Sequence, residues 1–117
     1  MKANPMRIYI STPISGRGEP SFEEKRKVAY RRVKMLSAYI AEEWPEAEIR
    51  SPFDAVPLNE ECSESVAIGR CINIVLTCDA ILLDRGWNAS RGCNLEYRAA
   101  KIYDLEIIDG NGQLGSL

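Results

Sequence analysis

Ala80-Ile81-Leu82-Leu83, followed after a short loop by Ser90-Arg91-Gly92-Cys93-Asn94-Leu95-Glu96, is the stretch that decides the fold of this chain. The first run is short and continuously apolar, which is typical of a strand buried on both faces of a parallel sheet. The second run opens a helical pattern that extends to about Tyr103. Ligands of open α/β sheets bind at the carboxyl ends of such strands, so we expect a functional site between these two runs.

Three residues of this stretch have properties suited to a ligand site. Gly92 lets the backbone approach a ligand closely, and the free N–H groups of a helix start, together with the Ser90 hydroxyl, can hold an anion such as phosphate. Glu96 is expected in the first helical turn, where the helix dipole keeps a carboxylate ionised. An ionised carboxylate beside a sugar can act as a nucleophile. The alternative is that Ser90 only caps the helix and Glu96 is exposed.

Strand and helix patterns alternate along the chain. The expected strands are Arg7–Ser11, Glu48–Ser51, Ala80–Leu83 and Leu105–Ile108, and the expected helices are Ser21–Glu43, a helix from about Asn59–Ser63 to Thr77, and Arg91–Tyr103. Alternation of this kind favours right-handed crossovers and parallel strands. We therefore predict one α/β domain over residues 1–117, a Rossmann/flavodoxin-like three-layer sandwich with a four- to five-stranded, mostly parallel sheet. Residues 1–5 and 110–117 are expected to be mobile tails.

The loops that follow the expected strands contain further candidate ligand contacts. Ser15, Gly16 and Arg17 stand in a loop rich in Gly and Pro after the first strand, which could hold a phosphate or a ribose or be a plain polar loop. Asp54 follows the second strand. Trp87 could stack on a base or simply pack against the protein.

The first long helix has two notable features. Ser21 and Glu24 match a capping box, which predicts a helix start at Ser21. The polar side of this helix is basic, with Lys25, Arg26, Lys27, Arg31, Arg32 and Lys34. We interpret it as a solvated face, although an acidic partner or a neighbouring subunit could also bind there.

Composition excludes several classes of function. The chain has 117 residues and a net charge of -2, which gives no reason to expect a nucleic-acid polymer as partner. No apolar run approaches membrane-spanning length, and the first residues lack the apolar core of a signal peptide, so we expect a cytoplasmic protein that does not bind membranes. There is no histidine, and the four cysteines form no C-x-x-C pair, so no metal site is expected. The cysteines are expected to be reduced and partly buried.

With these residues in hand, the sequence resembles the nucleoside 2-deoxyribosyltransferase superfamily, in particular its small members and the 2'-deoxynucleoside 5'-phosphate N-hydrolases. The resemblance covers most of the chain. It rests on the residues 7–16 (RIYISTPISG), 51–54 (SPFD) and 78–81 (CDAI), and on the pattern Gly86-Trp87-x-x-Ser90-x-Gly92-x-x-x-Glu96. It implies a homo-oligomer that acts on a small-molecule nucleoside or nucleotide and needs no cofactor.

The resemblance also implies roles for individual residues. Glu96 would be the nucleophile that attacks the anomeric carbon of a 2'-deoxynucleoside, and Tyr9 would orient its carboxylate. Ser90 would contact the 5'-phosphate, as in the nucleotide hydrolases. The loop with Ser15, Gly16 and Arg17 would hold the nucleotide, and Trp87 would be a platform for the base. Further candidates for substrate contacts are Asp54, Asp79 and Asp84.

One position departs from the family. Cys71 stands eight residues before Asp79, where the family often has an aspartate that orients the substrate or protonates the leaving base. A cysteine is a poor acid for a purine nitrogen. Either Asp54 or Asp84 substitutes, or the substrate needs no such acid, or the reaction has been lost. The predicted function is therefore cleavage or transfer at an N-glycosidic bond; the alternatives are a non-catalytic nucleotide-binding module and a structural or interaction protein.

Overall fold

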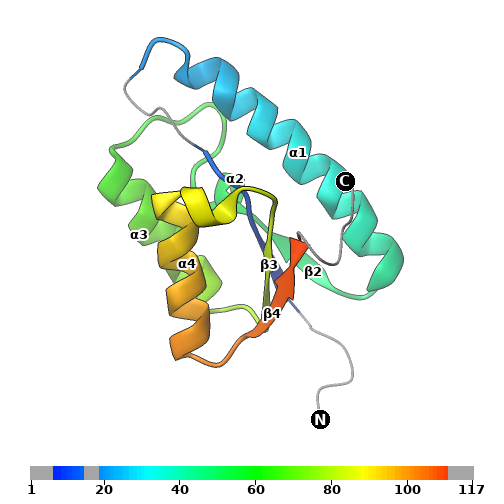
Figure 1. Ribbon diagram of the computed structural model, residues 1–117. Coiled ribbons are helices and arrows are strands. Elements are labelled where there is room, and N and C mark those ends of the chain that lie inside the picture. Colours follow the sequence, from blue (N-terminus) through cyan, green and yellow to red (C-terminus); the bar gives the residue numbers. More distant parts are fainter. Residues whose placement is uncertain (1–6, 15–18, 111–117) are drawn as a thin grey trace.

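The computed structural model describes residues 7–14 and 19–110 of the chain (Figure 1). The elements are β1 (Arg7–Ser11), α1 (Phe22–Glu43), β2 (Glu48–Arg50), α2 (Pro52–Ala55), α3 (Glu64–Val75), β3 (Ala80–Leu83), the 3-10 helix η1 (Trp87–Ala89), α4 (Arg91–Ile102) and β4 (Glu106–Asp109). The four predicted strands and three long helices are confirmed, with ends that differ by at most a few residues. The short helices α2 and η1 stand where only turns and loops were expected.

The described strands form one four-stranded parallel sheet in the order β2-β1-β3-β4. After β1 the chain adds β2 on one side, then crosses back to place β3 on the other side of β1. Helix α1 covers one face of the sheet, and α3 and α4 cover the opposite face (Figure 1). The predicted α/β three-layer sandwich is thus confirmed. The reversal between β1 and β3 is the point at which open α/β sheets bind ligands.

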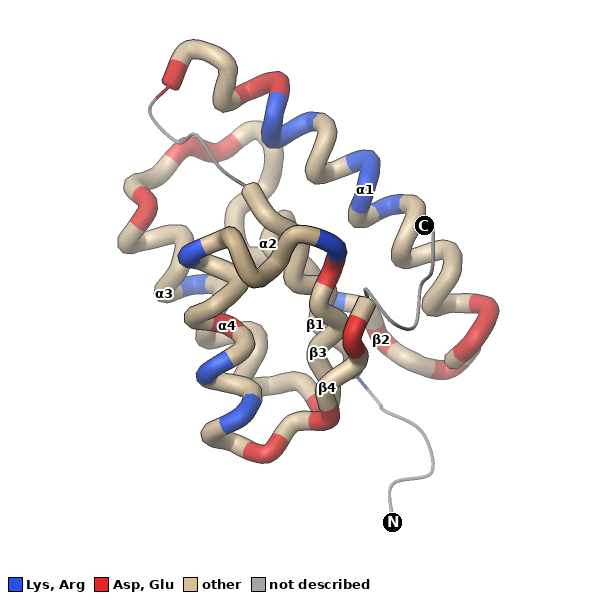
Figure 2. The backbone as a smooth tube through the Cα atoms, in the orientation of Figure 1, with Lys and Arg blue, Asp and Glu red and all other residues tan. Residues whose placement is uncertain are grey.

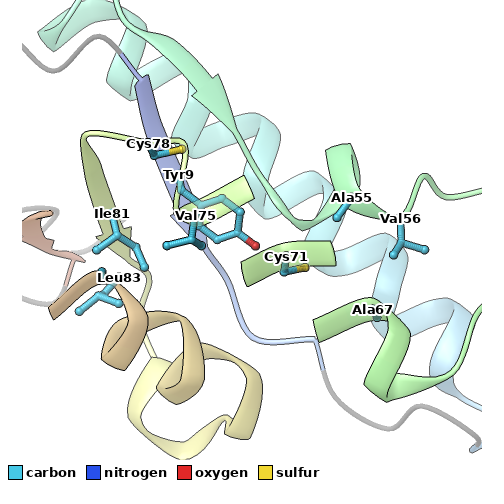
Figure 3. Close-up of a cluster of buried hydrophobic side chains, with 10 residues drawn as sticks. Tyr9, Ala55, Val56, Ala67, Cys71, Val75, Cys78, Ile81 and Leu83 are labelled. Atoms are coloured by element: carbon cyan, nitrogen blue, oxygen red, sulfur yellow. The ribbon is translucent and has the colours of Figure 1, made fainter. Parts of the chain in front are cut away.

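Side-chain alternation along β1 divides the core into two parts. Ile8 and Ile10 belong to the cluster under α1, together with Leu36 and Ile40. Tyr9 points to the other face and belongs to the cluster under α3 and α4. Figure 3 shows the Tyr9 ring beside Val75, with its hydroxyl directed towards Cys71. Because successive residues of a strand point to opposite faces, Ser11 lies on the same face as Tyr9.

Helix α1 is held by a buried stripe at helical spacing: Phe22, Arg26, Ala29, Val33, Leu36 and Ile40. The predicted capping box at Ser21 is wrong, because Ser21 precedes the helix without a side-chain hydrogen bond to it. A capping box does occur at α2, where Ser51 accepts a hydrogen bond from the Phe53 N–H and Asp54 accepts one from the Ser51 N–H. Pro52 at the helix start suits this short helix, since its fixed φ is helical and it needs no donor.

The basic residues of α1 are concentrated in its N-terminal half (Figure 2), but two of them do not belong to a solvated face. Arg26 is only 2% exposed and lies in the buried stripe. Arg32 forms an ion pair with Asp84 at 2.8 Å. Both arginines therefore face the protein, and neither belongs to a solvated face.

Residues 1–6, 15–18 and 111–117, which include nearly all of the predicted mobile tails, lie outside the described residues. Within residues 7–14 and 19–110, no helix is long and apolar enough to cross a membrane.

Candidate functional site

A cavity of about 350 Å³ opens at the carboxyl end of β1. Its walls come from the segment after β1, from α2, and from the N-terminal parts of α3 and α4. Much of the lining is apolar, including Phe53, Val56 and Ile68, and a few polar groups converge on it. Such a cavity at the switch point of the sheet is the expected form of a small-molecule site.

Glu96 is the central polar group of this cavity. It is 3% exposed and lines the cavity from α4. The Tyr9 hydroxyl donates a hydrogen bond to Oε2 at 2.7 Å, and the Ser11 hydroxyl donates one to Oε1 at 2.6 Å. Each carboxylate oxygen thus has a hydroxyl donor from β1, and the carboxylate is fixed in position.

The electrostatics of Glu96 differ from the prediction. Helix α4 begins at Arg91, so Glu96 lies beyond its first turn and faces the protein interior. Burial raises the pKa of Glu96 to about 7, although hydrogen bonds from Ser11, Tyr9 and Cys71 favour the charged form. The expectation of a dipole-stabilised carboxylate with a low pKa is therefore wrong, because desolvation outweighs the hydrogen bonds. The alternative of an exposed Glu96 is also wrong, since the residue is buried.

Tyr9 is fully buried, and its pKa is raised well above its ordinary value. The main cause is burial, and the nearby Glu96 adds to it. Tyr9 therefore stays protonated at all ordinary pH values and remains a hydrogen-bond donor. This is the state that an orienting tyrosine needs.

Ser90 and Gly92 bring the start of α4 to the cavity. Ser90 is the N-cap, and its hydroxyl accepts a hydrogen bond from the Cys93 N–H at 3.2 Å. A Cβ at Gly92 would lie 3.5 Å from Cδ1 of Ile68, which is ordinary contact. Ser90 therefore caps the helix, as the alternative interpretation expected, and both residues also line the cavity, where a ligand could reach them.

Two cysteines line the cavity beside Glu96. Cys71 extends from α3 and hydrogen-bonds to Tyr9 and Glu96. Cys93 is 2% exposed, and burial raises its pKa to about 11. All four cysteines are free thiols, as predicted, and Cys93 is protonated at neutral pH.

The three predicted aspartates do not line this cavity. Asp79 precedes β3 at the amino edge of the sheet, where it accepts a hydrogen bond from the Arg7 N–H. Asp54 caps its own helix and lines a second, smaller hollow against α1. Asp84 is buried, paired with Arg32, and accepts a hydrogen bond from the Thr12 hydroxyl.

The other predicted substrate contacts fall elsewhere. Trp87 packs on Tyr97 with 4.8 Å between ring centroids, and it does not line the cavity. Of its two predicted roles, the structure shows packing against the protein. Ser15, Gly16 and Arg17 lie outside the described residues.

Two polar residues of the site were missed as functional candidates. Ser11 could have been found from the strand period, because it lies two residues after Tyr9 on the same face. Arg26 interrupts an otherwise apolar helical stripe, and a cation at such a position signals a buried charge.

The site and fold define a class: an α/β protein with a parallel sheet and a buried carboxylate in a cavity at its switch point. The model of one family, described as Domain of unknown function (DUF4406), matches residues 6–109, and the chain belongs to this family. No curated protein matches the sequence.

Proposed function

We propose that this protein cleaves or transfers the N-glycosidic bond of a 2'-deoxynucleoside or its 5'-monophosphate, with Glu96 as nucleophile. The observation that carries the proposal is the placement of Glu96. It is a buried carboxylate in a ligand-sized cavity, and the hydroxyls of Tyr9 and Ser11 hold both of its oxygens. A fixed carboxylate beside an anomeric carbon is the group that retaining glycosyl chemistry requires.

In the proposed first step, a carboxylate oxygen of Glu96 forms a bond to C1' as the bond from C1' to the base nitrogen breaks. The base leaves with the electron pair of that bond and takes up a proton. In the second step, water or an acceptor base attacks C1' and releases the Glu96 carboxylate. Tyr9 and Ser11 keep the carboxylate positioned in both steps, which lowers the entropic cost of the attack.

Burial of Glu96 bears directly on this chemistry. A carboxylate that is poorly solvated loses little hydration when it attacks, but it must first be ionised. With the pKa of Glu96 at about 7, roughly half of the protein carries the charged form near neutral pH. The reaction would therefore be pH-dependent in the physiological range.

The proposal is tested by chromatographic detection of free base. Wild type, Glu96→Gln and Glu46→Gln are incubated with a panel of 2'-deoxynucleosides and their 5'-monophosphates, with and without an acceptor base. Glu46 is an exposed glutamate, so its variant is the matched control. We expect release by wild type and Glu46→Gln and at least about a thousandfold less by Glu96→Gln. If wild type releases no base from any member of the panel, the catalytic proposal is wrong.

A non-catalytic nucleotide-binding module is a second candidate, and one observation favours it. Among the described lining residues, the only carboxylic acids are Glu64 and Glu96. Neither Asp54 nor Asp84 lines the cavity, and Cys71 occupies the position where the resembling family often has an aspartate. A leaving base would thus have few sources for a proton. Nucleotide binding by calorimetry without release of base would support this candidate.

A further inference from the structure

The base that departs from C1' must carry off the electron pair of the glycosidic bond, and the groups that line the cavity decide how it does so. A side-chain acid can protonate the base as it leaves, or the base can leave as an anion. An acid suited to this task holds a proton near neutral pH and gives it up readily. The chemistry of the lining therefore distinguishes the two routes.

Two carboxyl groups line the cavity in the described part of the chain, and neither suits this task. Glu96 must be ionised to attack C1', and the hydroxyls of Tyr9 and Ser11 donate to its two oxygens. Glu64 accepts hydrogen bonds from the Arg91 guanidinium at 3.0 Å, and its side chain is 62% exposed. A hydrated carboxylate that is paired with a guanidinium is charged and has no proton to give to a base.

The other polar groups of the lining are poor proton donors. Burial raises the pKa of the Cys93 thiol to about 11, and the Cys71 thiol hydrogen-bonds to Tyr9 and Glu96. The two arginines of the lining do not lose a proton in proteins, and its serine and threonine hydroxyls are much weaker acids. The chain has no histidine, and residues 1–6, 15–18 and 111–117 include no Asp, Glu, Cys or Tyr. Within the described lining, no side chain is thus suited to protonate a leaving base.

We propose that the base leaves unassisted, as an anion, which limits the substrates to 2'-deoxynucleosides or their 5'-monophosphates whose base is acidic at its glycosidic nitrogen. Uracil and its 5-substituted derivatives are such bases, because their two carbonyl groups delocalise the negative charge. Cytosine is not, because it leaves readily only after its N3 has been protonated. This substrate class rests on the proposed function and adds to it which bases can depart.

The reaction balances without an acid in the cavity. The ionised Glu96 oxygen forms a bond to C1' as the bond from C1' to N1 breaks, and N1 keeps the electron pair. The base anion then takes a proton from water and leaves a hydroxide. That hydroxide, or an acceptor base that has lost its proton to it, attacks C1' and releases the Glu96 carboxylate.

The test measures kcat/KM for base release from two pairs of substrates that are matched in size. 5-Fluoro-2'-deoxyuridine is paired with 2'-deoxyuridine, and 5-bromo-2'-deoxyuridine is paired with thymidine; the halogenated base of each pair is the more acidic. Each is supplied as the nucleoside and as the 5'-monophosphate at about pH 7, where N3 is still mostly protonated. Wild type should release the halogenated base at least about tenfold faster in each pair, and cytosine about a hundredfold more slowly than uracil.

The pH dependence with 2'-deoxyuridine is a second readout. An acid that protonates the base would lose its proton at high pH, so kcat/KM would fall again and the profile would be bell-shaped. Without such an acid, kcat/KM should rise as Glu96 ionises and then stay level until the substrate itself ionises at N3. This readout is sensitive to an acid from any source, including a second copy of the chain.

Two variants examine the groups nearest to an acid role. Glu64→Gln and Cys71→Ala each remove a hydrogen-bonding group from the lining, and Glu46→Gln, at an exposed position, is the control. The ratio of kcat/KM within each substrate pair should be the same in all three variants as in wild type. A ratio compares two leaving groups in one protein, so a general loss of activity in a variant does not affect it.

Equal rates within either pair, release of cytosine as fast as uracil, a bell-shaped pH profile, or a larger ratio in Glu64→Gln or Cys71→Ala would each overturn this inference. Base release would stand as the function in all of these cases. If wild type releases no base even from the 5-halogenated substrates, the proposed function itself is wrong, and the substrate class falls with it. The two failures are therefore distinguishable, and the wild-type measurements decide between them even if a variant does not fold.

Discussion

The Tyr9 hydroxyl donates a 2.7 Å hydrogen bond to Glu96, a residue 87 positions further along the chain. Strand β1 supplies the donor and α4 supplies the carboxylate, so the contact exists only when the two elements are packed together. Ser11 adds a second donor from the same strand. The position and the protonation of Glu96 thus depend on β1, and the first prediction concerns that dependence.

If ionised Glu96 is the nucleophile, kcat/KM for base release should rise with pH through an inflection near 7, the pKa of this carboxyl. Tyr9→Phe and Ser11→Ala each remove a hydrogen bond that favours the charged form, so each should move the inflection to higher pH. The measurement is a pH–rate profile of the three proteins. An inflection that stays in place in both variants would show that the titrating group is not Glu96.

A second prediction concerns stability. The pKa of Glu96 is raised on folding, so the native protein binds more protons than the unfolded chain between about pH 4 and pH 7. The contribution of Glu96 to the free energy of unfolding is therefore greatest at low pH. It falls by roughly 3 kcal/mol in total as the pH rises through about 7. Glu96→Gln should remove this loss, and the variant should be more stable than wild type at about pH 8.

Urea unfolding at several pH values measures this difference, with Glu46→Gln as the control that should follow wild type. The free energy of unfolding of Glu96→Gln relative to wild type should increase steadily from about pH 4 to pH 8. A constant difference would mean that Glu96 titrates alike in the folded and unfolded protein.

The local sequence pattern was sufficient to predict the strands and helices of this protein, but not all of its candidate site. The β-rich run of β1, the apolar run of β3 and the spacing in α1 and α4 predicted the elements of a parallel α/β sheet, whereas the strand order β2-β1-β3-β4 was not predicted. The start of α4 at Arg91 was predicted, but the burial of Glu96 was not, because it depends on the packing of α4 against Tyr9 and Ser11 of β1. The partners of Asp84 and Asp79 were set by tertiary contacts, which no local pattern contains.

Asp84 illustrates this point and supports a third prediction. It is 2% exposed, and the Arg32 guanidinium donates to both of its oxygens. Removing one partner of a buried ion pair leaves the other charge unpaired. Asp84→Asn should therefore lower the free energy of unfolding by about 3 kcal/mol. Denaturant unfolding would measure this loss of stability. Asp79→Asn, at the amino edge of the sheet, is the comparison variant.

Binding should separate the structural role of Asp84 from a role in substrate recognition. Because Asp84 does not line the cavity, folded Asp84→Asn should retain its affinity for the nucleotide that wild type binds. A loss of binding by more than about tenfold in folded protein would show that Asp84 acts on the ligand, either directly or through Thr12.

The last prediction uses two glycines in helices. Gly92 in α4 lines the cavity, whereas Gly69 in α3 is exposed and has nothing near its Cβ position. Alanine has the higher helix propensity, so Gly92→Ala and Gly69→Ala should each stabilise the protein by about 0.5 kcal/mol. Only Gly92→Ala places a methyl group in the cavity wall, against Ile68, and it should weaken nucleotide binding by about tenfold. Thermal unfolding and calorimetry on both variants test this pair of effects. If Gly92→Ala binds as tightly as Gly69→Ala, the ligand does not approach the start of α4, and the site must lie elsewhere in the cavity.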